Sequence, residues 1–110
     1  MNLDQLNDTR VAKALQKLAS TDERQAELSH DLKYTEEKIK QATAHAFLLA
    51  TGTVAEREAK AQTDEKRNEA FLEWLEAYKA LKMMDNERNQ EIRITELFQT
   101  LSANRRKGSL

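Results

Sequence analysis

Glutamate and histidine at helical spacing raise the question of a metal site in this sequence. Glu27 and His30 are three positions apart, which places both on one face of a helix, as in bundles that bind metal ions. Such bundles use the motif twice. The second histidine, His45, does not repeat it, because Ala42 and not a glutamate lies three positions before it. A homodimer would supply a repeat, but one such motif arises by chance in a glutamate-rich chain. We therefore predict an ordinary histidine, with no metal and no cofactor.

Carboxylates also recur at helical spacing, at Glu69, Glu73 and Glu76. No histidine or cysteine lies nearby to complete an acid–base set, so a solvated helix face is the simpler interpretation. The sequence has no glycine-rich phosphate loop and no nucleophile-elbow or zinc-protease motif. We expect a protein that is not an enzyme and takes no small-molecule substrate.

Two basic groups are candidates for contact with nucleic acid. Arg105, Arg106 and Lys107 are consecutive near the C-terminus, and Arg57 and Lys60 are three positions apart. Cations in the last turn of a helix are also favoured by the helix dipole, which is the structural alternative. The functional interpretation is phosphate contact that weakens with salt.

Aromatic residues at helical spacing admit a similar pair of interpretations. Trp74 and Tyr78 could stack on bases, as aromatics do in single-strand binders. They share a stripe with Phe71, Leu81 and Met84, however, and aliphatic neighbours gain only from burial. We therefore expect these aromatics to be structural.

The composition indicates exposed helices. Of 110 residues, 39% are hydrophobic and 34% charged; there is no proline, and Gly52 and Gly108 are the two glycines. A formal charge of -1 argues against a uniformly basic surface, and the absence of cysteine fits a reducing compartment. The polar first ten residues do not resemble a signal peptide, and no stretch is apolar enough to span a membrane. We expect a cytoplasmic protein with no membrane contact.

A heptad seam, the row of positions that faces a partner helix, runs through the first half of the chain. Its positions are separated by three and four residues in turn: Val11, Ala14, Leu18, Thr21, Gln25, Leu28, Leu32, Thr35, Ile39, Ala42, Ala46 and Leu49. Asn7, Asp8 and Thr9 can cap the start of this helix. Ser20 and Glu23 form a second capping box, which leaves a break near Ser20 open, although the seam continues unshifted.

The clearest interruption is at residues 51–53, where Gly52 can end a helix and Thr53 with Glu56 can begin another. We therefore predict an all-α fold, a long antiparallel helical hairpin resembling a coiled coil. Its single domain, 1–110, has a first arm over about 9–50, a turn at 51–53, a second arm over about 54–104 and a basic tail at 105–110. Thr63 and Asp64 offer a restart within the second arm.

A two-helix hairpin buries only one side of each helix, so a homo-oligomer, with a dimeric helical bundle favoured, is expected. Aromatics such as Trp74 and Phe98 would then meet the second copy. No apolar residue occurs from Asp85 to Glu91, so this interval should be solvated or cross something charged.

Two blocks, TGTVAEREAKA at 51–61 and LSANRR at 101–106, resemble a family of small helical phage proteins. These proteins look like products of early-region genes near homologous-recombination functions. The resemblance implies a non-enzymatic accessory role in DNA recombination or DNA metabolism in the cytoplasm of a bacterial host. The partner that the resemblance implies is DNA, single-stranded DNA included, or a recombination protein.

Two functions remain open at this stage. In the first, Arg57, Lys60, Arg105, Arg106 and Lys107 of an oligomer contact DNA. In the second, the chain is a coiled-coil adaptor or assembly scaffold that binds protein partners only, with Phe98 and Leu101 as a docking patch.

Overall fold

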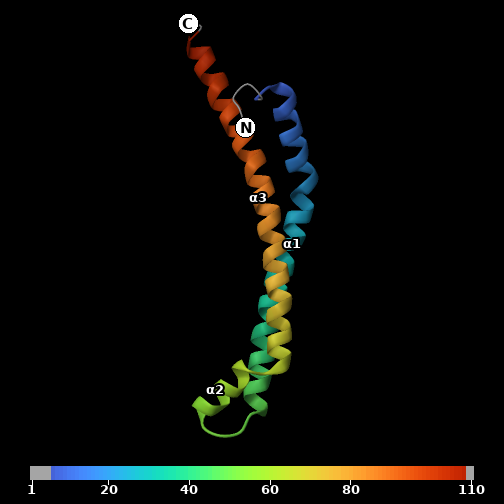
Figure 1. The fold of residues 1–110 in the computed structure, drawn as a ribbon, viewed down its shortest axis with the longest axis vertical. Helices are drawn as coiled ribbons and strands as arrows, with labels where there is room; N and C mark the ends of the chain where they lie inside the picture. Colours follow the sequence, from blue (N-terminus) through green and yellow to red (C-terminus); the bar gives the residue numbers. More distant parts are fainter. Residues whose placement is uncertain (1–5, 109–110) are drawn as a thin grey trace. The chain divides into compact units, whose positions relative to one another are not determined.

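The fold is all-α, a helical hairpin whose two long helices pair antiparallel (Figure 1). The computed structural model describes residues 6–108, which form three helices and no strand. These are α1 (Asp8–Leu49), α2 (Val54–Gln62) and α3 (Glu65–Gly108). The predicted fold class is therefore confirmed.

Each helix begins at a side chain that accepts a hydrogen bond from a free backbone amide. The amide of Arg10 donates to Asn7 Oδ1 at 2.9 Å, at the start of α1. The amide of Glu56 donates to Thr53 Oγ1 at 3.2 Å, at the start of α2. Asp64 Oδ2 accepts from the amide of Arg67 at 3.1 Å, so Asp64 caps α3.

No break occurs near Ser20, because α1 is continuous from Asp8 to Leu49. The Ser20 hydroxyl donates to the carbonyl oxygen of Lys17 at 3.0 Å, within the same helix, and does not cap a new one. α1 ends before Gly52, whose φ of +115° lies in a region that L-residues rarely adopt. A Cβ at this position would collide with the carboxylate of Glu56.

The second arm, predicted as a single range over about 54–104, consists of two helices in the structure. α2 ends at Thr63, whose amide bonds the carbonyl oxygen of Lys60 at 3.3 Å, and α3 restarts at the Asp64 cap. The restart signal at Thr63 and Asp64 therefore marks a real helix boundary.

The described chain divides into two compact units. Unit 1 contains the described residues up to Gln25 and those from Met83 onward, and unit 2 contains Ala26–Lys82. The α1 seam agrees with the prediction at all positions except the last. Val11, Ala14, Leu28 and Thr35 are buried and the others are half-buried, whereas Leu49 is 71% exposed.

The seam of α3 differs from the predicted stripe. Trp74, Leu81 and Met84 face α1, but Phe71 and Tyr78 are 37% and 41% exposed, at the edge of the seam. Most of the half-buried and buried positions of α3 instead form a heptad row that includes polar residues: Arg67, Ala70, Trp74, Ala77, Leu81, Met84, Arg88, Glu91, Thr95, Phe98 and Ser102. The prediction that Phe71 and Tyr78 belong to the buried stripe was therefore wrong for a single chain.

Candidate interaction surface

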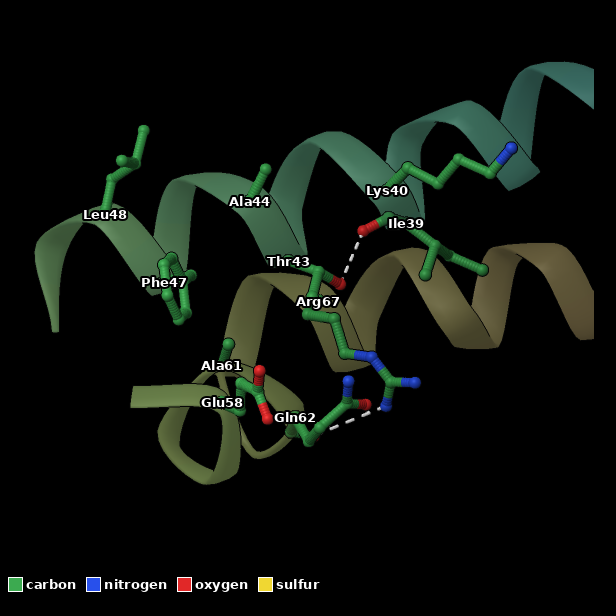
Figure 2. Close-up of a pocket in the computed structure, with 10 residues that line it drawn as sticks. All are labelled: Ile39, Lys40, Thr43, Ala44, Phe47, Leu48, Glu58, Ala61, Gln62 and Arg67. Atoms are coloured by element: carbon green, nitrogen blue, oxygen red, sulfur yellow. Dashed lines mark hydrogen bonds between the residues drawn. The ribbon is translucent and has the colours of Figure 1, made fainter. Parts of the chain in front are cut away.

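An open apolar groove follows one flank of unit 2, between α1 and α3, with α2 at its end. Its main part has a volume of about 600 Å³, and a contiguous part of about 310 Å³ continues along α3. Figure 2 shows Ile39 and Phe47 of α1 pointing toward α2 and α3, with Arg67 extending along the groove from α3. The two parts are lined by Glu36, Ile39, Lys40, Thr43, Ala44, Phe47, Leu48, Glu58, Ala61, Gln62, Arg67, Phe71 and Trp74.

Stacked aromatic rings border the groove on α3. The ring centroids of Phe71 and Trp74 are 5.9 Å apart, and those of Trp74 and Tyr78 are 5.3 Å apart. The indole N–H of Trp74 donates to Glu36 Oε1 across the seam at 3.3 Å. Leu75, 40% exposed, follows Phe71 by one helical turn, so both lie on the same flank of α3.

Arg67 is the cation at the centre of this flank. Its Nη1 donates to the carbonyl oxygen of Gln62 at 3.3 Å, and its guanidinium carbon lies 5.6 Å from the centroid of the Phe71 ring. Its Nε is buried and has no hydrogen-bond partner. An unsatisfied buried donor costs about 1–3 kcal/mol, so this Nε destabilises the seam of unit 2.

The opposite flank of unit 2 is polar. Lys38 Nζ lies 2.6 Å from Glu73 Oε2, and this hydrogen bond raises the pKa of the Lys38 ammonium. A second hollow on this side is lined mostly by polar side chains, among them His45, Lys66 and Glu69. The hairpin in unit 2 is therefore apolar on one flank and polar on the other.

Arg57 and Lys60, two of the predicted nucleic-acid residues, bond to backbone around the turn. Arg57 donates from Nε and Nη2 to the carbonyl oxygen of Phe47, at 3.3 and 3.2 Å, and its guanidinium carbon lies 4.2 Å from the centroid of the Phe47 ring. Lys60 Nζ donates to the carbonyl oxygen of Thr51 at 2.8 Å. Arg57 thus satisfies a carbonyl in the last turn of α1, where the helix dipole favours positive charge, and Lys60 satisfies one in the turn that follows. The sequence pattern did not indicate this structural role.

The other predicted basic residues, Arg105, Arg106 and Lys107, lie in the last turn of α3 and are exposed. They belong to unit 1, whereas Arg57 and Lys60 belong to unit 2.

Unit 1 has a polar seam where the sequence lacks apolar residues. The guanidinium of Arg10 makes two hydrogen bonds to the carboxylate of Glu91, at 2.8 and 3.1 Å. Glu91 is buried, and the hydrogen bond from Arg10 lowers the pKa of its carboxyl group. The seam also contains Arg88, which reaches Leu18 O at 2.9 Å, Thr21 Oγ1 at 2.7 Å and Asp22 Oδ1 at 2.6 Å, and a bond of 3.1 Å from Gln25 to Asp85.

The polar interval at 85–91 therefore contacts α1 and does not face solvent throughout. Of the two predicted interpretations, full solvation or contact with charged groups, the structure agrees with the second. Phe98 and Leu101, the predicted docking patch, are half-buried, and Phe98 lies on the α3 seam. They do not form an exposed apolar end.

The candidate metal ligands lie on the surface. Glu27 and His30 are exposed, and so is His45. Within residues 6–108, no three histidine, aspartate or glutamate side chains gather in an arrangement able to hold a metal ion. In the same range, no helix combines the length and apolarity that crossing a bilayer requires.

Comparison of the chain with protein-family models, with curated proteins and with solved structures finds no match.

Proposed function

We propose that this protein is a non-enzymatic helical adaptor or scaffold that binds another protein through the apolar flank of unit 2. The observation that carries the proposal is the contrast between the two flanks of one hairpin. One presents Ile39, Phe47, Phe71 and Trp74 along a groove, and the other presents the Lys38–Glu73 ion pair. A groove between two helices is the form of site that receives an amphipathic helix.

The groove suits a helix better than a small molecule. Small-ligand sites bury most of the ligand surface and hold it with a few convergent polar groups. This groove is open along its length, and most of its exposed lining is apolar. A third helix would cover the apolar lining of both helices at once.

Site-specific photo-crosslinking tests the proposal. A photoreactive residue at Leu75, on the groove flank, should give a defined crosslinked protein in cells that make the chain. The same group at Leu49, which is exposed and lines a hollow on the other flank, is the matched control. Equal crosslinking at both positions, or none at either, would refute docking through this flank.

A second candidate function is DNA contact by the basic tail, as an accessory protein of phage recombination acting in the cytoplasm of a bacterial host. The exposed positions of Arg105, Arg106 and Lys107 in one turn support it, as does the resemblance of residues 51–61 and 101–106 to small phage proteins. The rest of the predicted DNA surface has less support, because Arg57 and Lys60 already bond to carbonyls of the hairpin.

A gel-shift titration at several salt concentrations tests this second candidate. Replacing Arg105 and Arg106 by alanine should reduce the slope of log affinity against log salt by about 1.4 for single-stranded DNA. The exposed pair Lys13→Ala and Arg93→Ala removes the same charge elsewhere and serves as the control. Binding that is absent, or that both double variants alter equally, would exclude the tail as a DNA contact.

A further inference from the structure

We propose that the occupant of the groove in unit 2 is a second copy of this chain, whose own groove receives the first copy in a two-fold arrangement. This inference rests on the proposed function, because it assumes that the apolar flank is a protein interface. It adds the identity of the partner and the symmetry of the contact.

The first argument is that one flank contains both halves of such a contact. The groove supplies a recess lined by Ile39, Phe47 and Trp74. Beside it, Phe71, Leu75 and Tyr78 form an apolar ridge, since they are separated by four and three residues on α3 and are 37%, 40% and 41% exposed. A patch that carries both a recess and a ridge is self-complementary, which is the requirement for a two-fold interface.

The second argument is the amount of surface left uncovered. The chain exposes 8346 Å², whereas a folded monomer of 12.7 kDa exposes about 6200 Å² by the usual scaling with mass. The surplus of about 2100 Å² is spread over the whole chain, and covering the groove flank would need only the roughly 800 Å² that each partner buries in a standard interface. Within residues 6–108, no large side chain is fully buried, so a second copy would supply core that one chain lacks.

The third argument is charge. The groove carries Lys40 and Arg67 together with Glu36 and Glu58. Because both signs occur on the same patch, a two-fold related copy offers carboxylates to cations and cations to carboxylates. A carboxylate from that copy would also pair with the accessible part of the half-buried Arg67 guanidinium. The formal charge of -1 gives little repulsion between copies.

Sedimentation of the full chain over a range of concentrations tests the inference. The wild type should be a dimer, and Leu75→Glu, which places a charge on the ridge, should weaken dimerisation at least about tenfold. Leu49→Glu makes the same substitution at an exposed site on the polar flank, and it should change the dimer constant by less than about twofold. A monomeric wild type, or equal effects of the two substitutions, would overturn the inference.

The fluorescence of Trp74 reports the same event without relying on a variant. It is the single tryptophan of the chain and it lines the groove. Its emission should shift to the blue with increasing protein concentration, with the same midpoint as sedimentation, and in Leu75→Glu this midpoint should move to a concentration at least about tenfold higher. If the emission of Trp74 does not change across the monomer–dimer transition, the interface lies elsewhere and the inference is refuted.

These outcomes separate this inference from the proposed function. A crosslink from position 75 to another copy of the chain supports the second-copy proposal. A monomeric chain that is crosslinked at position 75 and not at position 49 to a different protein retains the adaptor function and refutes the second copy. A monomer without any crosslink at position 75 refutes both.

Discussion

Glu91→Gln tests the polar seam of unit 1, the feature most unlike an ordinary coiled coil. The side chain of Glu91 is 7% exposed and that of Arg10 is 29% exposed, so one partner of the ion pair is dry and the other partly reaches water. Hydrogen bonds to charged groups contribute about 1.5–3 kcal/mol, and fully exposed pairs contribute about 0–1 kcal/mol. Arg10 can rehydrate when its partner is neutralised, so we expect a loss of about 2 kcal/mol.

The pH dependence gives this prediction its sharper form. The hydrogen bond from Arg10 lowers the pKa of the Glu91 carboxyl group below its ordinary value of 4.5. Folding therefore favours the ionised carboxylate, so the stabilisation is complete above about pH 4.5 and is lost as the pH falls through the lower pKa of the folded state. The stability difference between wild type and Glu91→Gln should be constant from pH 7 down to about pH 5 and then shrink.

Urea unfolding at several pH values and one fixed protein concentration measures this difference. Glu87→Gln is the matched control, because Glu87 lies one turn earlier on α3 and is exposed. It should cost less than about 0.5 kcal/mol at any pH. Equal losses for the two variants, or a difference that does not change below pH 4.5, would refute a stabilising role of the ion pair.

Three substitutions in unit 2 should also alter thermal unfolding. Gly52→Ala should cost about 1–2 kcal/mol because of the positive φ and the nearby Glu56, whereas Gly108→Ala, which meets no atom within 4 Å, should be neutral. Arg57→Met retains contact with the Phe47 ring but loses two bonds to its carbonyl, so a loss of about 1 kcal/mol is expected; no loss would make these bonds incidental. Trp74→Ala removes two ring contacts of a half-buried side chain and should cost about 2 kcal/mol; an unchanged melting temperature would contradict its structural role.

The first long helix and the turn could be predicted because their signals are local. The seam of α1 repeats without a shift from Val11 to Ala46, and every position of it is buried or half-buried. The conformation of Gly52 and the caps at Thr53 and Asp64 depend on residues within a few positions of one another. Backbone propensity and capping fix such features before any tertiary contact forms.

The phase of α3 could not be predicted in the same way, because five of its seam positions are charged or polar and the helix has apolar residues on two faces. Phe71 and Tyr78 fit a stripe as well as Trp74 and Leu81 do. The true seam continues through Arg67, whose position depends on what α1 and α2 place opposite it. Hydrophobic periodicity identifies a face only when one face is apolar.

The basic residues near the turn show a second limit of sequence reasoning. Arg57 and Lys60 are the residue types that bind phosphate, and their spacing does not indicate that the carbonyl oxygens of Phe47 and Thr51 are their acceptors. These carbonyls are free because α1 ends at Leu49 and the turn follows. A signal was available in the position of both cations just after a predicted helix end, where unpaired carbonyls must find donors.

The two units differ in how far their seams are satisfied by the chain itself, and this difference indicates where a partner should bind. In unit 1 the ionic side chains of the seam have partners across it, from Arg10–Glu91 to Arg88–Asp22. In unit 2 the cation on the seam, Arg67, retains a buried Nε with no acceptor, beside exposed Phe71. Burial of apolar area lowers the free energy of association. Charge added to the groove flank of unit 2 should therefore impair assembly more than the same charge added at exposed Leu15 of unit 1.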